Sequence, residues 1–339
     1  QDYMIPNGVH AYGRRFNPFG PDNYPAEIEK IREMTAVRDT AIWRALQGET
    51  MDVAAADQQT RTLPPVETNY DPARHGDTRY LYGEEALEQL TTAPGYKVEL
   101  FASEEEFEDL ANPVQITFDN HGRLWVATMP SYPHYKPGDE RPDDKLIILE
   151  DTDGDGKADR QTVFADGLHL PVGFMLTEEG VYVSQGPDLV LLRDTTGDDR
   201  ADTREVILSG FDDHDTHHAH STYTMDPSGA FYMAEGVFLH SNIETSYGPV
   251  RGTNGGFFRY SPQRRHLERT AQLSIPNPWG IVFDEWGQDF FAETSGPDVL
   301  WMLPGELRPE YGVATLKSRN LIEDAHRVRP TSGLEIVSS

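Results

Sequence analysis

Two acidic loops hold the residues of this sequence that are best suited to bind a metal ion. The first reads DTDGDGKAD, and a glycine at its sixth position, Gly156, permits a sharp turn. Its candidate ligands, at positions 1, 3, 5, 7 and 9, are Asp151, Asp153, Asp155, the main-chain carbonyl of Lys157, and Asp159. Oxygen ligands at this spacing are typical of calcium-binding loops. The loop therefore predicts a calcium site.

The pattern returns 43 residues later as DTTGDDRAD. Its candidate ligands, at positions 1, 3, 5, 9 and 12, are Asp194, Thr196, Asp198, Asp202 and Glu205. Asp199 stands where the first loop has glycine, so the turn geometry of the second is in question. The alternative for both loops is a polar turn, because Asp and Gly favour turns without any ion. Like charges repel unless a cation lies among them, and this favours calcium.

Both loops join segments that read as strands: KLIILE and RQTVFA flank the first, and LVLLR and TREVIL flank the second. The arrangement predicts calcium-clipped β-hairpins rather than helix–loop–helix units. A calcium ion there would have a structural role.

A strand–turn–strand pattern recurs along the chain from residue 96. Its turn glycines are Gly122, Gly180, Gly229 and Gly287, spaced by 58, 49 and 58 residues, and a fifth copy begins at Thr331. A further strand pair follows each of the first four copies. Four antiparallel strands per ~50 residues are typical of a propeller blade. We predict an all-β fold, a β-propeller over 96–339 with four blades and a fragment, incomplete at its C-terminus and six-bladed when complete.

Residues 1–60 differ in kind from this repeat. Pro25 suits a first helical turn, and apolar residues recur after it at loose helical spacing, which predicts an N-terminal helical extension. One amphipathic helix cannot fold alone, so it must dock elsewhere. Residues 61–95 are rich in polar residues and proline and predict a linker.

The composition excludes several classes of partner. Lys plus Arg number 29 against 57 Asp plus Glu, for a formal charge of −28, so the surface repels nucleic acid and anionic membranes. No cysteine is present, which excludes disulfides and haem attachment within this chain. No apolar run approaches the ~18 residues of a spanning helix. With Gln1 in place of an initiator Met, we expect a processed or partial chain in an extracytoplasmic, calcium-rich setting.

The loop that leads into each innermost propeller strand should lie at one mouth of the central channel. The third such loop, residues 212–220, holds four histidines among three aspartates. His217 and His220 with a nearby carboxylate suit a transition metal, or one imidazole suits a general base. The remaining alternative is a polar loop that lines the channel. We also expect one set of residues to converge at this mouth: Asn112, His169, His217, Asn277 and Arg329.

The block from Asn7 to Gly13 resembles the C-terminal end of the SGNH/GDSL hydrolases, where a DxxH block supplies the acid and base of a catalytic triad. Here Asn7 replaces the aspartate, and the serine-bearing block is absent, so His10 cannot run that mechanism. The resemblance implies the tail of a hydrolase-like module, and the alternative is a plain helical extension.

Residues from about 94 to 339 resemble the β-propellers of a planctomycete family named membrane-bound dehydrogenases, which are similar to the pyrroloquinoline-quinone (PQQ) dependent glucose and sorbosone dehydrogenases. The matching motifs are Pro113…Phe118-Asp119…Gly122-Arg-Leu-Trp125, DTDGDGKAD, Gly167-Leu…Pro171, Asp215-Thr-His217 and Asp226…Gly229. The resemblance implies a sugar or alcohol substrate and a histidine, His217 or His220, that takes the hydroxyl proton.

The same resemblance implies Gln185, Asn277 and Arg329 as contacts of PQQ. That cofactor carries three carboxylates and needs several cations, whereas the mouth loops are net acidic. We therefore expect weak PQQ binding or none, and dehydrogenation only with further C-terminal blades. The rival hypothesis is a non-catalytic propeller that binds a protein partner in a surface or envelope assembly.

Overall fold

The computed structural model describes residues 24–63, 80–132, 140–273, 275–296, 298–303, 318–323 and 333–336. The chain divides into two compact units, one made of residues 1–80 and 134–141 and the other of residues 81–133 and 142–339. The hydrolase-like block at residues 7–13 lies outside the described residues.

Helices make up the described part of the first unit. The expected helix is present as α3 (Tyr24–Leu46), and a short helix follows as α4 (Val53–Asp57), whose N-cap Asp52 accepts a 2.9 Å hydrogen bond from the Ala55 amide. Buried Lys30 donates to the Arg61 carbonyl at 2.7 Å, which holds the segment after α4 against α3. Ile42, Trp43 and Leu46 at the end of α3 expose 59–73% of their surface.

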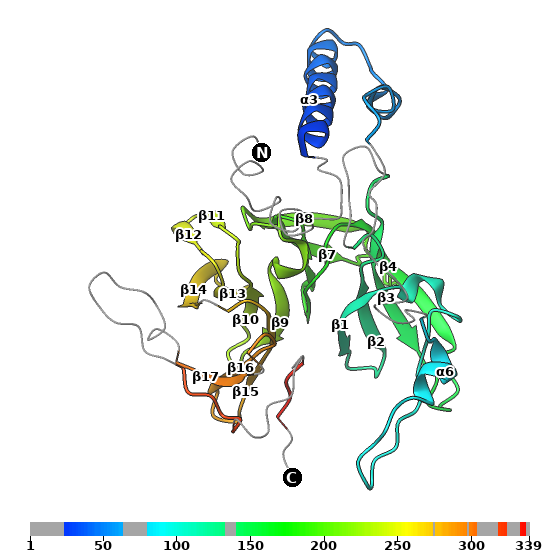
Figure 1. Ribbon diagram of the computed structural model, residues 1–339, viewed down its shortest axis with the longest axis vertical. Coiled ribbons are helices and arrows are strands. Elements are labelled where there is room, and N and C mark those ends of the chain that lie inside the picture. Colours follow the sequence, from blue (N-terminus) through cyan, green and yellow to red (C-terminus); the bar gives the residue numbers. More distant parts are fainter. Residues whose placement is uncertain are drawn as a thin grey trace, which may run out of the picture. The chain divides into compact units, whose positions relative to one another are not determined.

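The described part of the second unit contains four antiparallel sheets of three or four strands, which we call blades 1 to 4 (Figure 1). Blade 1 contains β1 (Pro113–Phe118), β2 (Leu124–Thr128), β3 (Asp144–Glu150) and β4 (Arg160–Leu168). Blade 2 contains β5 (Phe174–Thr177), β6 (Gly180–Gln185), β7 (Asp188–Arg193) and β8 (Thr203–Ser209). Blade 3 contains β9 (Ser221–Met225), β10 (Phe231–Glu235), β13 (Gly256–Ser261) and β14 (His266–Gln272). Blade 4 contains β15 (Pro278–Phe283), β16 (Asp289–Glu293) and β17 (Asp298–Met302).

The four blades confirm the predicted all-β propeller arrangement with an N-terminal helix. Each begins with one copy of the strand–turn–strand pattern, and the sheet order follows the chain outward from that first strand. A hairpin of β11 (Asn242–Thr245) and β12 (Gly248–Arg251) is inserted in blade 3. Next to β17 the chain returns in a single bridge between Leu300 and Asn320. The number of blades in a complete ring stays a prediction.

Three short elements precede or accompany the blades. The first is α6 (Gly83–Leu87), which lies in the segment predicted as a linker, and the second is the 3₁₀ turn η1 (Glu108–Leu110). The third is the 3₁₀ turn η2 (Thr216–His218) inside the histidine-rich loop.

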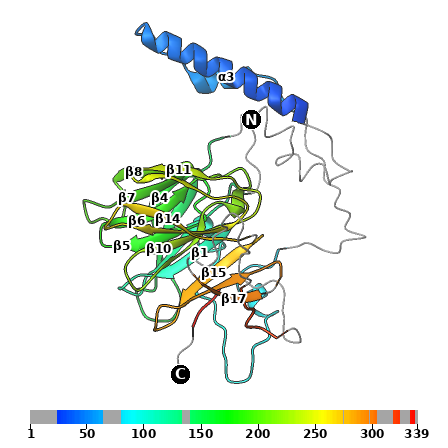
Figure 2. The same cartoon turned by 90° about the vertical axis from the view of Figure 1, so that its left-hand side faces the viewer.

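Apolar clusters between neighbouring sheets form the core. Figure 2 shows the ribbon of these sheets turned by 90° from the view of Figure 1. Trp125 and Ile148 of blade 1 pack with Val183 and Val190 of blade 2. Further clusters join blade 2 to blade 3 and blade 3 to blade 4 in the same way. Each sheet therefore buries a face against the next, and this packing aligns the equivalent ends of successive blades.

The turns between the first two strands share one aspartate-based design in blades 1, 3 and 4. Each begins with an aspartate whose carboxylate accepts from main-chain amides two and four residues later; these aspartates are Asp119, Asp226 and Asp284. The following glycines have φ of 78–80°, a left-handed conformation that glycine adopts without strain. The turn glycines found in the sequence are therefore explained by backbone geometry.

Arg123 links blade 1 to blade 2 at these turns. Its guanidinium donates to Asp119 at 2.7 Å and to Asp199, in the second acidic loop, at 2.8 Å. Burial opposes ionisation of Asp119, but hydrogen bonds from Trp125 and Arg123 outweigh it and lower its pKa to about 2. The charged aspartate is thus stabilised in the folded state.

We predict that Asp119→Asn lowers the free energy of unfolding at pH 7 by about 1–2 kcal/mol, allowing for solvent screening. Because the folded-state pKa lies below the unfolded one, this stabilisation is present above about pH 4 and is lost as pH falls towards 2. Urea unfolding between pH 3 and 7 measures it. The matched control is Asp284→Asn, because no arginine contacts this carboxylate among the residues that the structure describes. Equal losses in both variants would contradict the role of Arg123.

Candidate functional site

His217 lies where loops of several blades meet. Its Nδ1 is 3.2 Å from the hydroxyl of Tyr132, which follows β2 of blade 1. Its ring is parallel to the indole of Trp279 in β15 of blade 4, with a centroid separation of 6.2 Å and an interplanar angle of 8°. The side chain is half-buried, and among the described residues no hydrogen bond reaches Nε2. His217 is thus oriented by two other blades, with one nitrogen left for a ligand.

The adjacent His218 is held on both sides. Its Nδ1 is 2.7 Å from the Asp215 carboxylate, and its Nε2 is 2.7 Å from the side-chain oxygen of Asn277 in blade 4. The amide nitrogen of Asn277 in turn donates to Ser295 at 2.6 Å. Both nitrogens of His218 therefore face oxygen acceptors, which favours the doubly protonated ring.

These contacts shift the pKa values of the two histidines in opposite directions. Burial, followed by the neighbouring His218, lowers the pKa of His217. Burial also disfavours the charged form of His218, but hydrogen bonds to Asp215 and Asn277 outweigh it and raise its pKa. The arrangement favours the neutral form of His217 and the charged form of the adjacent His218, and a neutral imidazole is suited to act as a general base.

Blade 2 contributes His169 and Gln185 to the same end of the sheets. The Gln185 side-chain oxygen accepts from the His169 amide at 3.1 Å. The Asp213 carboxylate lies against Gly186, where an added Cβ would come within 3.0 Å of it. Burial raises the pKa of Asp213. Gln185 therefore positions the backbone of its own blade.

His220 is part of the core rather than of the mouth. It is 1% exposed, stacks on Phe211 at 4.0 Å and contacts the Tyr223 hydroxyl through Nδ1 at 2.6 Å. Burial lowers its pKa to about 3. A substrate has no access to a side chain placed in this way, so the geometry favours His217 among the two predicted bases.

The residues predicted to converge do so in part. The Asn112 carbonyl accepts a hydrogen bond from the Met129 amide at 3.0 Å. Met129 in turn packs with Leu170 and Ala219 in a small apolar cluster whose residues come from three blades. His217 and Asn277 both contact His218. Arg329 lies outside the described residues.

Sequence reasoning missed His218, Tyr132 and Trp279. It paired His217 with His220, whereas the groups that lie within 4.8 Å of one another are Asp215, His217 and His218. The 3₁₀ turn η2 produces this set, and no residue spacing indicates that turn. A histidine pair with a carboxylate suits a transition metal, so the metal hypothesis now concerns these three residues.

The first acidic loop has the geometry of a calcium loop. It joins β3 to β4, at the end of the sheet opposite His217, as the pairing of Phe118 with Leu124 and of Leu124 with Leu149 shows. Asp151 accepts from the amides of Gly154 at 2.6 Å and Gly156 at 2.9 Å. These amide hydrogen bonds, that of Gly156 first, lower the pKa of Asp151.

Three carboxylates of this loop gather closely enough for one ion. Oxygens of Asp151, Asp153 and Asp159 lie within 4.8 Å of one another, a spacing that is costly without a cation. The donor set consists of hard oxygen ligands, so the loop fits calcium. The predicted hairpin is confirmed, and the ion stays a prediction.

The second acidic loop keeps the turn but not the full donor set. Asp199 has a φ of 61°, and Gly156 at the equivalent position of the first loop has a φ of 89°. The aspartate therefore adopts the left-handed conformation despite its side chain. Asp194 accepts from the Asp199 amide at 2.8 Å. Glu205, the ligand predicted at position 12, instead forms an ion pair with Arg193 at 2.9 Å, so its carboxylate is already engaged. The first loop is therefore the better calcium site.

The other predicted ligands also form hydrogen bonds within their own loops. In the second loop the Thr196 hydroxyl donates to Asp198 at 3.0 Å, and Asp202 accepts from the Thr195 amide at 2.9 Å. In the first loop Asp155 accepts from the Lys157 amide at 2.8 Å.

Comparison with known proteins identifies the family. Residues 83–337 match the model of a domain of unknown function, DUF7133. The chain belongs to this family. The DUF7133 region begins inside the segment predicted as a linker and includes all four blades. No curated protein matches the chain.

Solved structures similar to this DUF7133 chain include three proteins. Regucalcin from Agrobacterium tumefaciens, a calcium-binding protein, is 18% identical over 66% of this chain and 63% of its own, with a TM-score of 0.40. The PQQ-bound aldose sugar dehydrogenase of Streptomyces coelicolor is 13% identical over 62% and 69%, with a TM-score of 0.37. The PQQ domain of Coprinopsis cinerea pyranose dehydrogenase is 14% identical over 62% and 48%, with a TM-score of 0.39. The chain thus matches about half to two thirds of their lengths.

A planctomycete origin and a hydrolase-like remnant stay predictions. Among the residues that the structure describes, no helix has the length and apolar character needed to cross a membrane.

We predict that chelation lowers the melting temperature of the DUF7133 chain, because calcium binds the folded loop. At calcium about 100-fold above Kd the shift is about 5–10 °C. Asp153→Asn abolishes most of the shift, whereas the matched change in the second loop, Asp198→Asn, leaves most of it. Differential scanning calorimetry with and without chelator measures both. A chelator effect that Asp153→Asn leaves intact would place the ion elsewhere.

Proposed function

We propose that this chain is a calcium-stabilised propeller that binds a small polyhydroxylated molecule, a sugar or an alcohol, at the mouth containing His217. The observation that carries the proposal is the position of His217. It is half-buried, its Nδ1 contacts Tyr132, and its pKa is lowered by burial and by His218.

His217 would act as a general base. If its Nδ1–H donates to the Tyr132 oxygen, the lone pair of Nε2 remains to accept the proton of a substrate hydroxyl. The nearby Asp215 carboxylate favours the resulting imidazolium and opposes the effect of burial. In this assignment Tyr132 sets the tautomer, and His218 with Asp215 sets the electrostatic environment.

The surroundings favour a neutral or cationic ligand. Trp279 and Tyr132 provide aromatic surface beside the imidazole. Asp213 and Asp215 add negative charge at the same loop. Apolar rings with a few convergent polar groups are typical of sites for small organic molecules. Negative charge at the mouth disfavours anions.

PQQ does not fit the described residues. Both amide atoms of Asn277 are engaged, by His218 and Ser295, and the oxygen of Gln185 accepts from its own blade. The described loops that lead into the first strand of each blade contain no Lys or Arg to pair with three carboxylates, and Arg269 of β14 is paired with buried Glu235 at 3.1 Å. The proton transfer proposed for His217 therefore involves no quinone.

The calcium loops support an extracytoplasmic location. Exposed oxygen ligands bind calcium usefully where its concentration is high, and the acidic surface suits such a setting. Calcium in these loops would stabilise hairpins at the end of the blades opposite His217 and would not touch a ligand at the mouth.

A second function, as a non-catalytic binding module, is favoured by the part of blade 1 that its neighbouring segments leave exposed, since Val126 and Ile147 on the same face are buried in a cluster with Leu110. Ile116 and Phe118 of β1 are 60% and 62% exposed, and a groove of about 370 Å³ runs between this strand and Val98. Equivalent faces between the blades are buried. A protein partner that contributes an apolar sheet would bury this face, as in a surface or envelope assembly.

We predict that His217→Gln weakens binding of an aldose or alditol at pH 7.5 tenfold or more, while His121→Gln, an exposed histidine in a turn, changes it less than twofold. Because the pKa of His217 is lowered, the base form persists to below pH 6.5, and binding falls as pH drops further. Isothermal titration calorimetry against a panel of sugars and alcohols between pH 5 and 8 measures this.

Two outcomes would overturn the proposal. Equal binding by the wild type and by His217→Gln would show that His217 does not bind the ligand. Absence of any hydroxylated ligand, together with oligomers of the wild-type chain that Ile116→Ser/Phe118→Ser abolishes, would favour the binding module. Dye reduction on addition of PQQ and calcium, abolished by His217→Gln, would contradict the poor fit of the quinone.

A further inference from the structure

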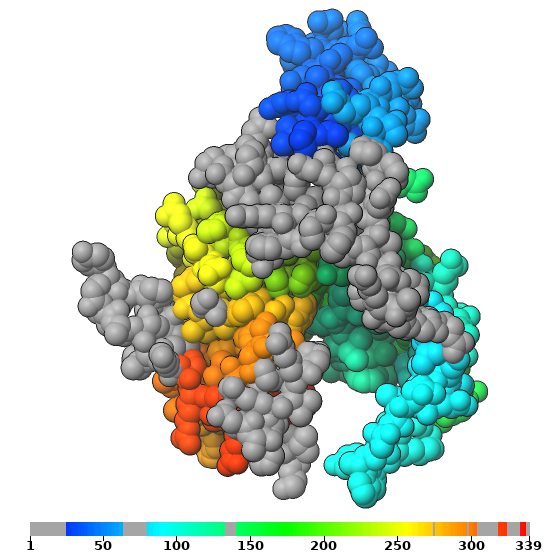
Figure 3. All heavy atoms as spheres, viewed as in Figure 1, coloured from blue at the N-terminus to red at the C-terminus, as the bar shows by residue number. Residues whose placement is uncertain are grey.

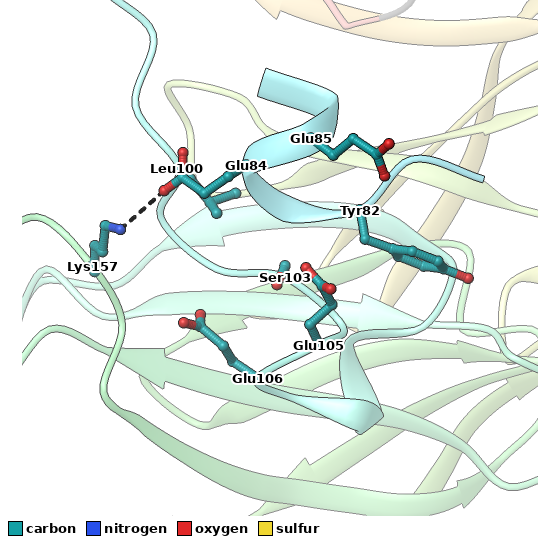
Figure 4. A pocket seen from close by; sticks show the side chains of 8 residues that line it. All are labelled: Tyr82, Glu84, Glu85, Leu100, Ser103, Glu105, Glu106 and Lys157. Carbon is teal, nitrogen blue, oxygen red and sulfur yellow. Dashed lines mark hydrogen bonds and ion pairs between the residues drawn. The ribbon is translucent and has the colours of Figure 1, made fainter. Parts of the chain in front are cut away.

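A separate hollow lies beside the first acidic loop, away from His217. Its volume is about 530 Å³, which is within the range of small-molecule sites. Figure 4 shows its lining, which comes from the start of α6, from the segment before η1 and from Lys157 in the loop. All of these belong to the second unit, and Figure 3 shows α6 at its surface.

The lining is strongly acidic. Glu84 pairs with the Lys157 ammonium group at 3.2 Å. Glu105 and Glu106 are exposed, and in the described part of the chain no cation contacts their carboxylates. A primary ammonium group, that of Lys157, is therefore already bound by one glutamate, and two further carboxylates lack such a partner.

Ser103 gives an independent indication of a ligand. It is 5% exposed and lines the hollow, yet its hydroxyl has no hydrogen-bond partner among the described residues. Its carbonyl accepts from the amides of Glu106 and Phe107, which fixes the residue in place. The hydroxyl oxygen of this otherwise buried residue is open to the hollow, so a ligand in the hollow can form a hydrogen bond with it.

The spacing of the carboxylates decides which cation fits. Within the described residues, the groups of three ligands within 4.8 Å of one another are the first acidic loop and the cluster around His217. Neither includes Glu84, Glu105 or Glu106. These three glutamates therefore do not form a three-carboxylate site for one metal ion, whereas an extended molecule with several ammonium groups can reach them separately. The ring of Tyr82 adds a surface that attracts ammonium groups.

We propose that this hollow binds a linear molecule with two or more primary ammonium groups. Glu105 and Glu106 each bind an ammonium group, and Ser103 accepts a hydrogen bond from the ligand. Such groups occur in free polyamines and in lysine side chains of a peptide. The site does not depend on the chemistry proposed for His217, so the two proposals fail independently.

The test is titration calorimetry of the whole calcium-saturated chain at ~0.15 M salt, where long-range attraction is screened. The probes are spermidine, 1-aminobutane and a Lys-Gly-Lys peptide. We expect one equivalent of spermidine or peptide to bind, and 1-aminobutane to bind at least tenfold more weakly. Whichever of spermidine and peptide binds more tightly identifies the source of the ammonium groups.

Matched variants separate the site from general surface charge. Glu105→Gln/Glu106→Gln should weaken binding tenfold or more, and Ser103→Ala should weaken it about threefold or more. Glu244→Gln/Glu285→Gln removes the same charge from exposed positions of blades 3 and 4 and should change binding less than twofold. Equal weakening by both double variants, no binding of either multivalent probe, or stoichiometric displacement by calcium alone would each overturn the proposal.

Discussion

The structure depends on the need of every sheet to bury its apolar faces. A single four-stranded sheet exposes two faces to water, and here successive sheets cover them with continuous clusters from blade 1 to blade 4. This packing brings the loop ends of the blades together. His217 therefore contacts Tyr132 and Trp279, which are 85 and 62 residues away in the sequence.

The two ends of the blades carry different chemistry. At one end the acidic hairpin loops gather carboxylates that a calcium ion would neutralise, and Arg123 joins two blades through Asp119 and Asp199. At the other end, Asp215, His217 and His218 shift one another's pKa values. Because the ends are separated by the length of the strands, stability and ligand chemistry can change independently. The acidic hollow beside Lys157 belongs to the first of these ends.

Much of the fold could be predicted from local rules. The turn glycines marked strand pairs because their left-handed φ is required there, and the aspartate spacing marked the hairpin loops. The site could be predicted only in part. His218 and His220 are indistinguishable by spacing, yet the turn η2 directs one to Asp215 and the other into the core. The hollow at Ser103 arises from segments that meet only in three dimensions.

The central claim is that His217 is a neutral base oriented by Tyr132. Titration of the histidine ring nitrogens by ¹⁵N NMR tests it most directly, with Tyr132→Phe as the comparison. The account predicts a pKa of His217 below 6.5, a neutral tautomer protonated at Nδ1, and a change of tautomer population in Tyr132→Phe. A pKa above 6.5, or a tautomer at Nε2 that is indifferent to Tyr132, would contradict it.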